Sequence, residues 1–502
     1  MNIMNELNKQ DTSNTSQAMW IGIGSLFSFL FSIVSSAILS RYLTKGDYGT
    51  YKQVMYVYTT LLSIFTLGLP LAYSYFLPRV SLGEGKTLVN KLNLAFIVLG
   101  GVFSVVLFLC SDIIAEVLKN PSLGRNLRIF SFAPILMLPR MGLQGILATY
   151  RKTIWNAVYV ISTRILMLLF VALPVVFYRA NCETAIYGFI VSSFISCIIA
   201  MILKNLPFKG VAKKTCDVSY IDILKYSIPL MVAGLLGIFI RAADQFFVSR
   251  YYGQEVFADF ANGSLELPFV SMVLNAGSAV LLPVFSRMIS DNTPISTILE
   301  LWERTAVKAA YILYPIIVFC FFFSTEIMTF LYGNMYESSS IYFRIMLVAN
   351  FFTVIQFYPI VLALGKTKEY ASVHIVILIM VWGLELLAVN YLQTPVAVTV
   401  VSVLCKILKM LLIIRIIAKT LNISVISLFP LKKLSETAIT CAIAGIISYC
   451  MVHMLPSNKN LVALLIGFTV FAPVAFGLGY ISKVDYLSVI RPITDKYFKK
   501  IK

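Results

Sequence analysis

Seven basic and three acidic residues of this sequence lie inside long apolar stretches. A charged side chain at the centre of a membrane-spanning helix costs about 2.5–3.5 kcal/mol, so such a residue usually faces a polar interior. Because the basic residues outnumber the acidic ones, a cavity that they line would attract an anion. Guanidinium groups suit phosphate because they bind it bidentately. The ten residues are Arg140, Arg164, Arg241, Lys308, Arg344, Lys406, Lys409, Asp244, Glu266 and Glu385.

Two arginines near the middle of their apolar segments are the leading candidates for such a cavity. Arg140 lies in the segment 127–149, and Gln144 follows it at the spacing of one helical turn on the same face. Arg164 lies near the middle of the segment 154–178. We predict that both arginines bind an anionic ligand. The other candidate binding residues are Arg241, Arg344, Arg41 and Lys52.

Several of these residues allow a second interpretation. Arg41 and Lys52 lie near segment ends and could equally anchor the helices at the membrane surface. Arg241 shares a helix face with Asp244, so the two could instead form a structural ion pair. Lys406 and Lys409 share a helix face and could either line the cavity or point toward the inner membrane surface. Lys308 lies near a helix end, and we expect its side chain to snorkel to the membrane surface.

Acidic residues are candidates for coupling or gating. They are Asp244, Glu266 and Glu385. We expect Glu266 to lie on a helix one turn after Asn262, and Glu385 to share a face with His374 three turns earlier. His374 itself is expected to be a packing residue.

The patterns that would indicate catalysis, a metal or a nucleotide are missing from the sequence. Two Gly-Lys-Thr tripeptides occur, at 85–87 and 365–367, but the glycine that a phosphate-binding loop needs is replaced by Val80 and Ile360. The two histidines have no metal-ligand neighbours, the eight cysteines form no Cys-x-x-Cys pair, and no Gly-x-Ser-x-Gly or Asp-x-Asp motif occurs. We therefore expect no catalytic residue, metal or cofactor.

The composition is that of a membrane protein that crosses the bilayer many times. The chain has 502 residues, of which 59% are hydrophobic and 13% charged, and its mean hydropathy is +0.86. Soluble domains are about 25% charged, so a soluble enzyme, a disordered chain and a collagen-like chain are excluded. The net charge of +18 is spread along the sequence, which argues against a nucleic-acid partner.

Fourteen segments are long and apolar enough to span a bilayer. The first is too long for the apolar part of a cleaved signal peptide, so we expect it to be retained. Most of the 41 lysines and arginines fall on one side of the resulting topology, which predicts that both termini are cytoplasmic. The segments are 18–40, 53–77, 92–110, 127–149, 154–178, 184–203, 226–250, 256–286, 304–331, 338–364, 370–392, 396–418, 434–455 and 460–481.

An internal repeat indicates two halves. Ser40–Tyr51 aligns without a gap to Ser249–Phe260, with a shared Ser-Arg-Tyr and two aromatic positions in register. Parallel repeats of this kind are a transporter design with the substrate site between the halves, although chance similarity between two interfacial anchors would give the same match. The predicted parts are a six-helix lobe 1–203, a basic cytoplasmic linker 204–225, a six-helix lobe 226–418, two further helices 434–481 and a basic cytoplasmic tail 482–502.

Two segments resemble bacterial polysaccharide flippases. Arg41-Tyr-Leu-Thr-Lys-Gly-Asp-Tyr48-Gly49-Thr-Tyr51 resembles the family's R-x-L-G-x-x-x-Y-G-x-Y segment, with Thr44 in place of glycine. The stretch Tyr226-Ser-Ile-Pro229, followed by Ala243-Asp244-Gln and Tyr252-Gly253, resembles the Y-S-x-P … I-D-R … L-G segment that opens the second half. Gln245 stands where arginine is common. The motifs suit O-antigen and capsule repeat-unit (Wzx-like) flippases and also teichuronic-acid and sporulation-type exporters.

The resemblance implies an all-α fold of the multidrug/oligosaccharidyl-lipid/polysaccharide transporter superfamily. It further implies that the two lobes, formed by helices 1–6 and helices 7–12, work by alternating access. They would move undecaprenyl-diphosphate-linked repeat units from the inner to the outer leaflet of a bacterial inner membrane. Membrane lipids, H⁺ or Na⁺ as coupling ion, and polysaccharide polymerase and chain-length proteins are the partners that it suggests. A cation-coupled multidrug or small-molecule antiporter of the same superfamily and a membrane polysaccharide polymerase or ligase remain as alternatives.

Overall fold

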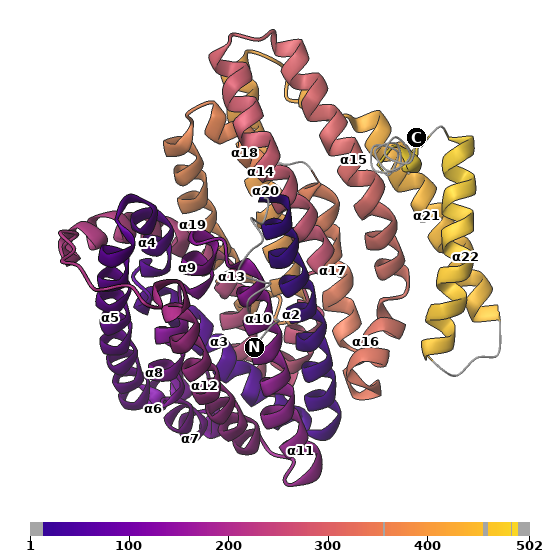
Figure 1. Cartoon of the computed structure of the whole chain (residues 1–502). Coiled ribbons are helices and arrows are strands. Elements are labelled where there is room, and N and C mark those ends of the chain that lie inside the picture. Colours follow the sequence, from indigo (N-terminus) through magenta and orange to yellow (C-terminus); the bar gives the residue numbers. More distant parts are fainter. Residues whose placement is uncertain (1–13, 355–356, 455–459, 483, 490–502) are drawn as a thin grey trace, which may run out of the picture. The chain divides into compact units, whose positions relative to one another are not determined.

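The computed structural model describes residues 14–354, 357–454, 460–482 and 484–489, and all the regular structure in these ranges is helical (Figure 1). The chain divides into two compact units, Met1–Ala258 and Asp259–Lys502, and α13 (Tyr220–Gly263) runs across the boundary. Each unit is described by itself. The predicted lobes stay a prediction, and most of the predicted tail 482–502 lies outside the described residues.

The first unit contains short helices as well as spanning ones. Before α13 it holds α2 (Asn14–Tyr42), α3 (Lys45–Phe65), α4 (Leu69–Phe76), η1 (Leu77–Arg79), α5 (Leu82–Leu109), α6 (Ser111–Val117), α7 (Pro121–Phe130), α8 (Ala133–Met137), η2 (Leu138–Arg140), α9 (Leu143–Thr149), α10 (Thr153–Met167), the π-helical turn η3 (Leu168–Ala172), α11 (Leu173–Phe177), α12 (Cys182–Asn205) and η4 (Leu206–Phe208).

The second unit contains the remaining helices. They are α14 (Pro268–Ser290), α15 (Ile295–Phe322), α16 (Ser324–Tyr332), η5 (Asn334–Tyr336), α17 (Ser339–Thr353), α18 (Phe357–Ala363), α19 (Thr367–Tyr391), α20 (Pro395–Leu421), η6 (Ile426–Leu428), α21 (Leu431–Met454), α22 (Asn460–Ile481) and η7 (Tyr486–Val489).

The number of membrane spans agrees with the sequence. Twelve helices in the described ranges are long and apolar enough to cross a membrane, and the number rises to 14 when two bent pairs each count as one span. The pairs are α3 with the segment Leu69–Arg79, bent by 47°, and α17 with α18, bent by 41°. The all-α, polytopic prediction is thus confirmed.

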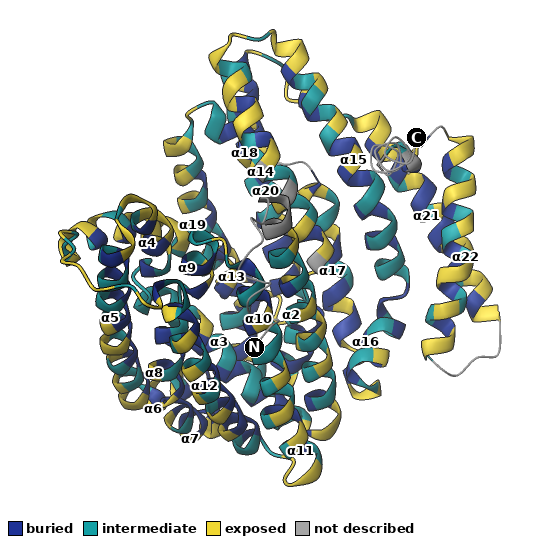
Figure 2. Ribbon diagram, viewed as in Figure 1, coloured by how far each residue is buried: buried dark blue, intermediate teal, exposed yellow. Residues whose placement is uncertain are grey.

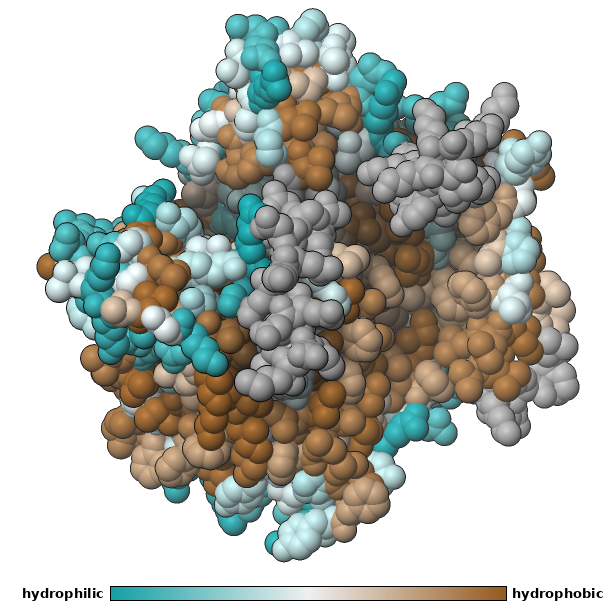
Figure 3. All heavy atoms as spheres, viewed as in Figure 1, coloured by the Kyte–Doolittle hydropathy of each residue, from teal (hydrophilic) through white to brown (hydrophobic). Residues whose placement is uncertain are grey.

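Helix α5 shows why these helices suit a bilayer. One side of it is buried within the unit and the opposite side is exposed, yet both sides are apolar (Figure 2). A helix that is hydrophobic all round is stable only where its outer side meets lipid or more protein. Figure 3 shows the same pattern on one face of the first unit, where hydrophobic side chains cover the middle of the helices and hydrophilic ones gather toward their ends. The exposed apolar residues of α5 include Leu94, Val98, Val102, Val105 and Leu109.

Helix breaks support the internal repeat. The first copy breaks at Thr44, whose extended backbone caps α3 by accepting the Asp47 amide at 3.1 Å. The second copy breaks inside α13 at Gly253, where φ is +80°. Thr44 and Gly253 are the same position of the repeat. The copies also touch, because a Cβ on Gly49 would lie 1.9 Å from the carbonyl oxygen of Gln254.

The expected segments 256–286 and 304–331 are interrupted in the structure. Helix α13 continues to Gly263 and α14 begins only at Pro268, so Glu266 lies in the connection and not on a helix one turn after Asn262. A proline disfavours helical backbone in the residue before it, and Leu267 is accordingly extended (φ −69°, ψ 118°). The expected helix 304–331 is also divided, because α15 ends at Phe322 and α16 begins at Ser324.

Candidate functional site

Arg140 is placed by a break in the middle of its membrane span. The turn η2 ends at Arg140, Met141 is extended, and Gly142 has φ of +76° before α9 begins. A Cβ on Gly142 would lie 2.1 Å from Cδ2 of Tyr73, so a side chain fits neither the backbone nor the space. The expected helical spacing between Arg140 and Gln144 is therefore wrong, since they lie on opposite sides of the break.

A buried lysine holds this break from a neighbouring helix. Lys204 of α12 is fully buried, and its Nζ donates to Pro139 O at 2.7 Å, Asn93 Oδ1 at 2.8 Å and Tyr73 Oη at 3.3 Å. The Tyr73 hydroxyl donates in turn to Asn93 Oδ1 at 3.1 Å. The network joins α4, α5, η2 and α12 at the residue next to Arg140. All three acceptors are neutral, so they satisfy the ammonium group without cancelling its charge.

This role of Lys204 was not predicted, because the sequence placed it in the basic linker 204–225. A signal was present, because Ser196 and Ala200 precede Lys204 at successive four-residue steps and lie on the same helix face. Both are buried, as is Lys204. A lysine that continues a face of small residues is directed into the protein, whereas a linker lysine would point toward solvent.

Arg140 and Arg164 lie on neighbouring elements of the first unit. Arg164 lies in the middle of its span, as expected, and its Nε donates to Ser28 Oγ of α2 at 2.8 Å. Helix α9, which follows Arg140, packs through Leu143 and Leu147 against Tyr159 of α10, the helix that carries Arg164. Both arginines are half-buried, and among the described residues neither forms an ion pair with a carboxylate. Two guanidinium groups therefore share one region without a neutralising partner.

Arg41 lies in the first copy of the repeat, and Lys52 directly follows that copy. The Nζ of Lys52 donates to Ser36 Oγ at 3.3 Å and lies 5.1 Å from the centroid of the Tyr48 ring. Arg41 is exposed in the last turn of α2. Arg250, at the equivalent position of the repeat, donates to the carbonyl oxygen of Val117.

Arg241 and Asp244 lie on one face of α13 but differ in burial. Arg241 is exposed, whereas Asp244 is 4% exposed and its Oδ1 accepts the backbone N–H of Gln245 at 2.9 Å. Asp244 is thus held inside the first unit. The structure gives no ion pair to Arg241 within the described ranges.

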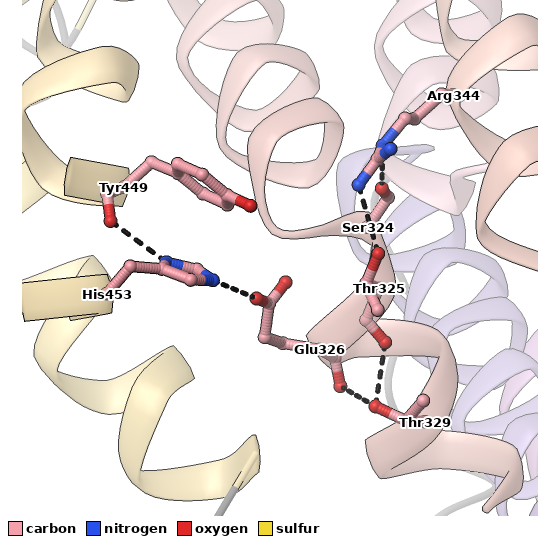
Figure 4. Close-up of polar contacts among 7 residues, drawn as sticks. All are labelled: Ser324, Thr325, Glu326, Thr329, Arg344, Tyr449 and His453. Carbon is pink, nitrogen blue, oxygen red and sulfur yellow. Dashed lines mark hydrogen bonds and ion pairs between the residues drawn. The ribbon is translucent and has the colours of Figure 1, made fainter. Parts of the chain in front are cut away.

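The remaining candidates lie in the second unit. Glu385 of α19 is fully buried. Arg344 of α17 donates to the hydroxyls of Ser324 and Thr325, the latter at 3.0 Å (Figure 4). Lys406 of α20 lies 3.5 Å from the Met346 sulfur.

Comparison with protein families gives a direct match. A family model described as "Polysaccharide biosynthesis protein" matches residues 15–289, more than half of the chain. Among curated proteins, no significant match is found.

Solved structures share the fold at low sequence identity. The inward closed conformation of the lipid II flippase MurJ is 15% identical, with a TM-score of 0.69 over 91% of this chain and 98% of that one. A variant of the Vibrio cholerae MATE transporter VcmN is 14% identical, with a TM-score of 0.56 over 81% and 96%. A MOP-superfamily transporter from Pyrococcus furiosus is 12% identical, with a TM-score of 0.54 over 80% and 94%.

The fold expected from the resemblance is thus confirmed. The chain has the polytopic helical fold of these solved transporter structures.

Proposed function

This chain belongs to the polysaccharide biosynthesis protein family, and from that premise we propose that it is a flippase for a lipid-linked oligosaccharide. The likeness to a structure named as a lipid II flippase supports a lipid-linked substrate. We propose undecaprenyl-diphosphate-linked repeat units of O-antigen or capsule, moved by alternating access from the inner to the outer leaflet of a bacterial inner membrane. Both termini would be cytoplasmic. Polymerase and chain-length proteins would receive the product.

The observation that carries this proposal is the group of Arg140 and Arg164. Two half-buried guanidinium groups on neighbouring elements have no carboxylate ion-pair partner among the described residues, which favours binding of an anion. A diphosphate offers two negative groups at neighbouring positions, and each can accept a bidentate pair of hydrogen bonds. Nearby hydroxyls of Ser28 and Tyr159 add donors for a phosphate or a sugar.

The other candidate residues take secondary roles in the proposal. Lys52, Arg41, Arg241 and Arg344 would attract or guide the anionic substrate. Asp244, Glu266 and Glu385 would couple transport to H⁺ or Na⁺ or gate it. Burial of Asp244 and Glu385 supports this role, because a buried carboxylate favours a partner proton or cation.

Binding and transport by arginine variants test the site. R140A/R164A should lose affinity for a short-chain lipid diphosphate and stop export, with normal amounts of protein in the membrane. R140K/R164K keeps the charge but loses the bidentate fork, so it should retain part of the affinity. The matched control is R125A, since Arg125 is an exposed arginine paired with Glu183 on the same unit. Unchanged binding and export in R140A/R164A would refute the assignment.

A further inference from the structure

The N-terminal turn of α16 is held by two basic side chains from two different helices. On one side, Arg344 of α17 donates to the hydroxyls of Ser324 and Thr325. On the other side, Nε2 of His453 from α21 lies 3.4 Å from Oε1 of Glu326 (Figure 4). The arginine is always charged, whereas an imidazole gains or loses its proton between about pH 5 and 8. One contact is therefore permanent and the other depends on a proton.

The hydrogen bonds of His453 show that its contact with Glu326 needs an added proton. Nδ1 of His453 lies 3.0 Å from the backbone carbonyl oxygen of Tyr449, and a carbonyl can only accept. Nδ1 must then carry the hydrogen, so in a neutral imidazole Nε2 would present a lone pair to Glu326. A carboxylate also presents only lone pairs. The contact is attractive only when one proton is bound, on Nε2 or on the carboxyl group.

Glu326 is buried beside apolar side chains. The residue is 8% exposed, and its Oε2 has no hydrogen-bond partner within the described part of the chain. The pair adjoins an apolar cluster formed by Phe323, Val452 and Ala463, which also includes the Tyr449 ring. A carboxylate without a counter-charge is costly in such a place. The Tyr449 ring lies 4.0 Å from the imidazole centroid.

Other titratable groups near the pair do not replace the proton. From α17, Arg344 is engaged with the α16 hydroxyls; α16 carries Tyr332, and η5 carries Tyr336. From α15 comes the Cys320 thiol, and α21 adds Cys450 and Tyr449. The only ionisable side chain in the sequence of α22 is Tyr480, at the far end of the helix from Asn460. None of these is a second carboxylate or a second cation directed at Glu326 in the described residues.

We propose that Glu326 and His453 form a proton-binding site that fastens the end of α21 to α16. With the proton bound, imidazolium donates Nε2–H to the carboxylate and the two helices are joined. When the proton leaves to water, two sets of lone pairs face each other and the contact opens. If the chain is the proposed flippase, this site would also make transport sensitive to pH through the C-terminal helices.

Histidine NMR on the full-length protein in lipid nanodiscs tests the site without any transport assay. The chain has only two histidines, so H374Q assigns both signals. His374 is an internal control because its Nδ1 also bonds a backbone carbonyl, that of Tyr370 at 2.9 Å, and its ring also lies beside a tyrosine. The expected result is that E326Q changes the pH curve of the His453 signal and leaves that of His374 unchanged.

A His453 signal with the same pH curve in wild type and E326Q overturns the proposal. If E326Q does not fold, H453R is the second variant, because it supplies a permanent cation and should make the joined state independent of pH. For transport, we expect wild type to depend on pH between about pH 5 and 8 and H453R to lose that dependence. Wild type that moves no lipid-linked donor would refute the flippase function alone, since the NMR result does not depend on it.

Discussion

Replacing Lys204 by methionine tests whether the buried network holds the Arg140 turn in place. Methionine has nearly the length of lysine but no donor, so K204M removes the hydrogen bonds to Pro139, Asn93 and Tyr73. Asn93 keeps the Tyr73 hydroxyl as a donor. The carbonyl of Pro139 loses the ammonium that satisfies it, and that carbonyl belongs to the residue before Arg140.

The expected magnitude follows from the hydrogen bonds that K204M removes. A buried acceptor left without a donor costs about 1–3 kcal/mol, and every 1.4 kcal/mol is a factor of ten. The same change removes the desolvation cost of a buried charge, so the free energy of unfolding should change by no more than about 3 kcal/mol in either direction. Transport should fall by about 10- to 100-fold, because the turn that carries Arg140 would spend less time in the geometry that binds the substrate.

The assay compares K204M with K209M in proteoliposomes at equal protein content. Lys209 is exposed in the segment that follows α12, so K209M makes the same chemical change without touching the network. Export of a lipid-linked oligosaccharide and binding of a lipid diphosphate are measured for both. If K204M folds and transports at the rate of K209M, the positioning role of Lys204 is refuted.

Three further variants test other features. G142A should lower the free energy of unfolding by about 2 kcal/mol or more, because its Cβ would lie 2.1 Å from Tyr73 at a positive φ. The control G383A has open space around its Cβ and should be neutral or stabilising. Equal melting temperatures of the two variants would contradict this reasoning. Q53L should lower the free energy of unfolding by about 1–3 kcal/mol, because buried Gln53 donates to Ser249 Oγ at 2.7 Å and accepts from Asn120 at 2.5 Å. Q144L is the control at an exposed glutamine. An unaltered free energy of unfolding in Q53L would count against the network. E385Q should weaken the dependence of transport on a proton or sodium gradient while exposed E337Q keeps it, and an unchanged dependence would exclude Glu385 as a coupling residue.

The number of spans could be predicted from the sequence because each spanning helix needs only length and apolar content. The repeat was predicted from the shared Ser-Arg-Tyr, and the helices break at equivalent positions of its two copies, Thr44 and Gly253. The inside of the spans was harder to predict. Helical spacing was assumed between Arg140 and Gln144, but Pro139 and Gly142 interrupt the hydrogen-bond ladder between α8 and α9.

Side-chain environment decided the other differences. Lys204 follows an apolar helix and precedes a basic segment, which is also the pattern of a lysine at the membrane surface. Its burial depends on acceptors from Asn93 and Pro139, which are far away in the sequence. Glu266 was placed on a helix because the apolar run appeared continuous, whereas Gly263 and Pro268 delimit a non-helical connection.

The most direct test of the central claim is a leaflet measurement on the wild-type protein. Purified protein is reconstituted with a lipid-diphosphate-linked oligosaccharide present in both leaflets, and an external glycosidase reports the fraction that becomes accessible, with and without an ion gradient. A flippase should expose the donor beyond the half that is outside at the start. Accessibility that stays at one half, together with uptake of a cationic dye, would contradict the flippase account and favour a multidrug antiporter.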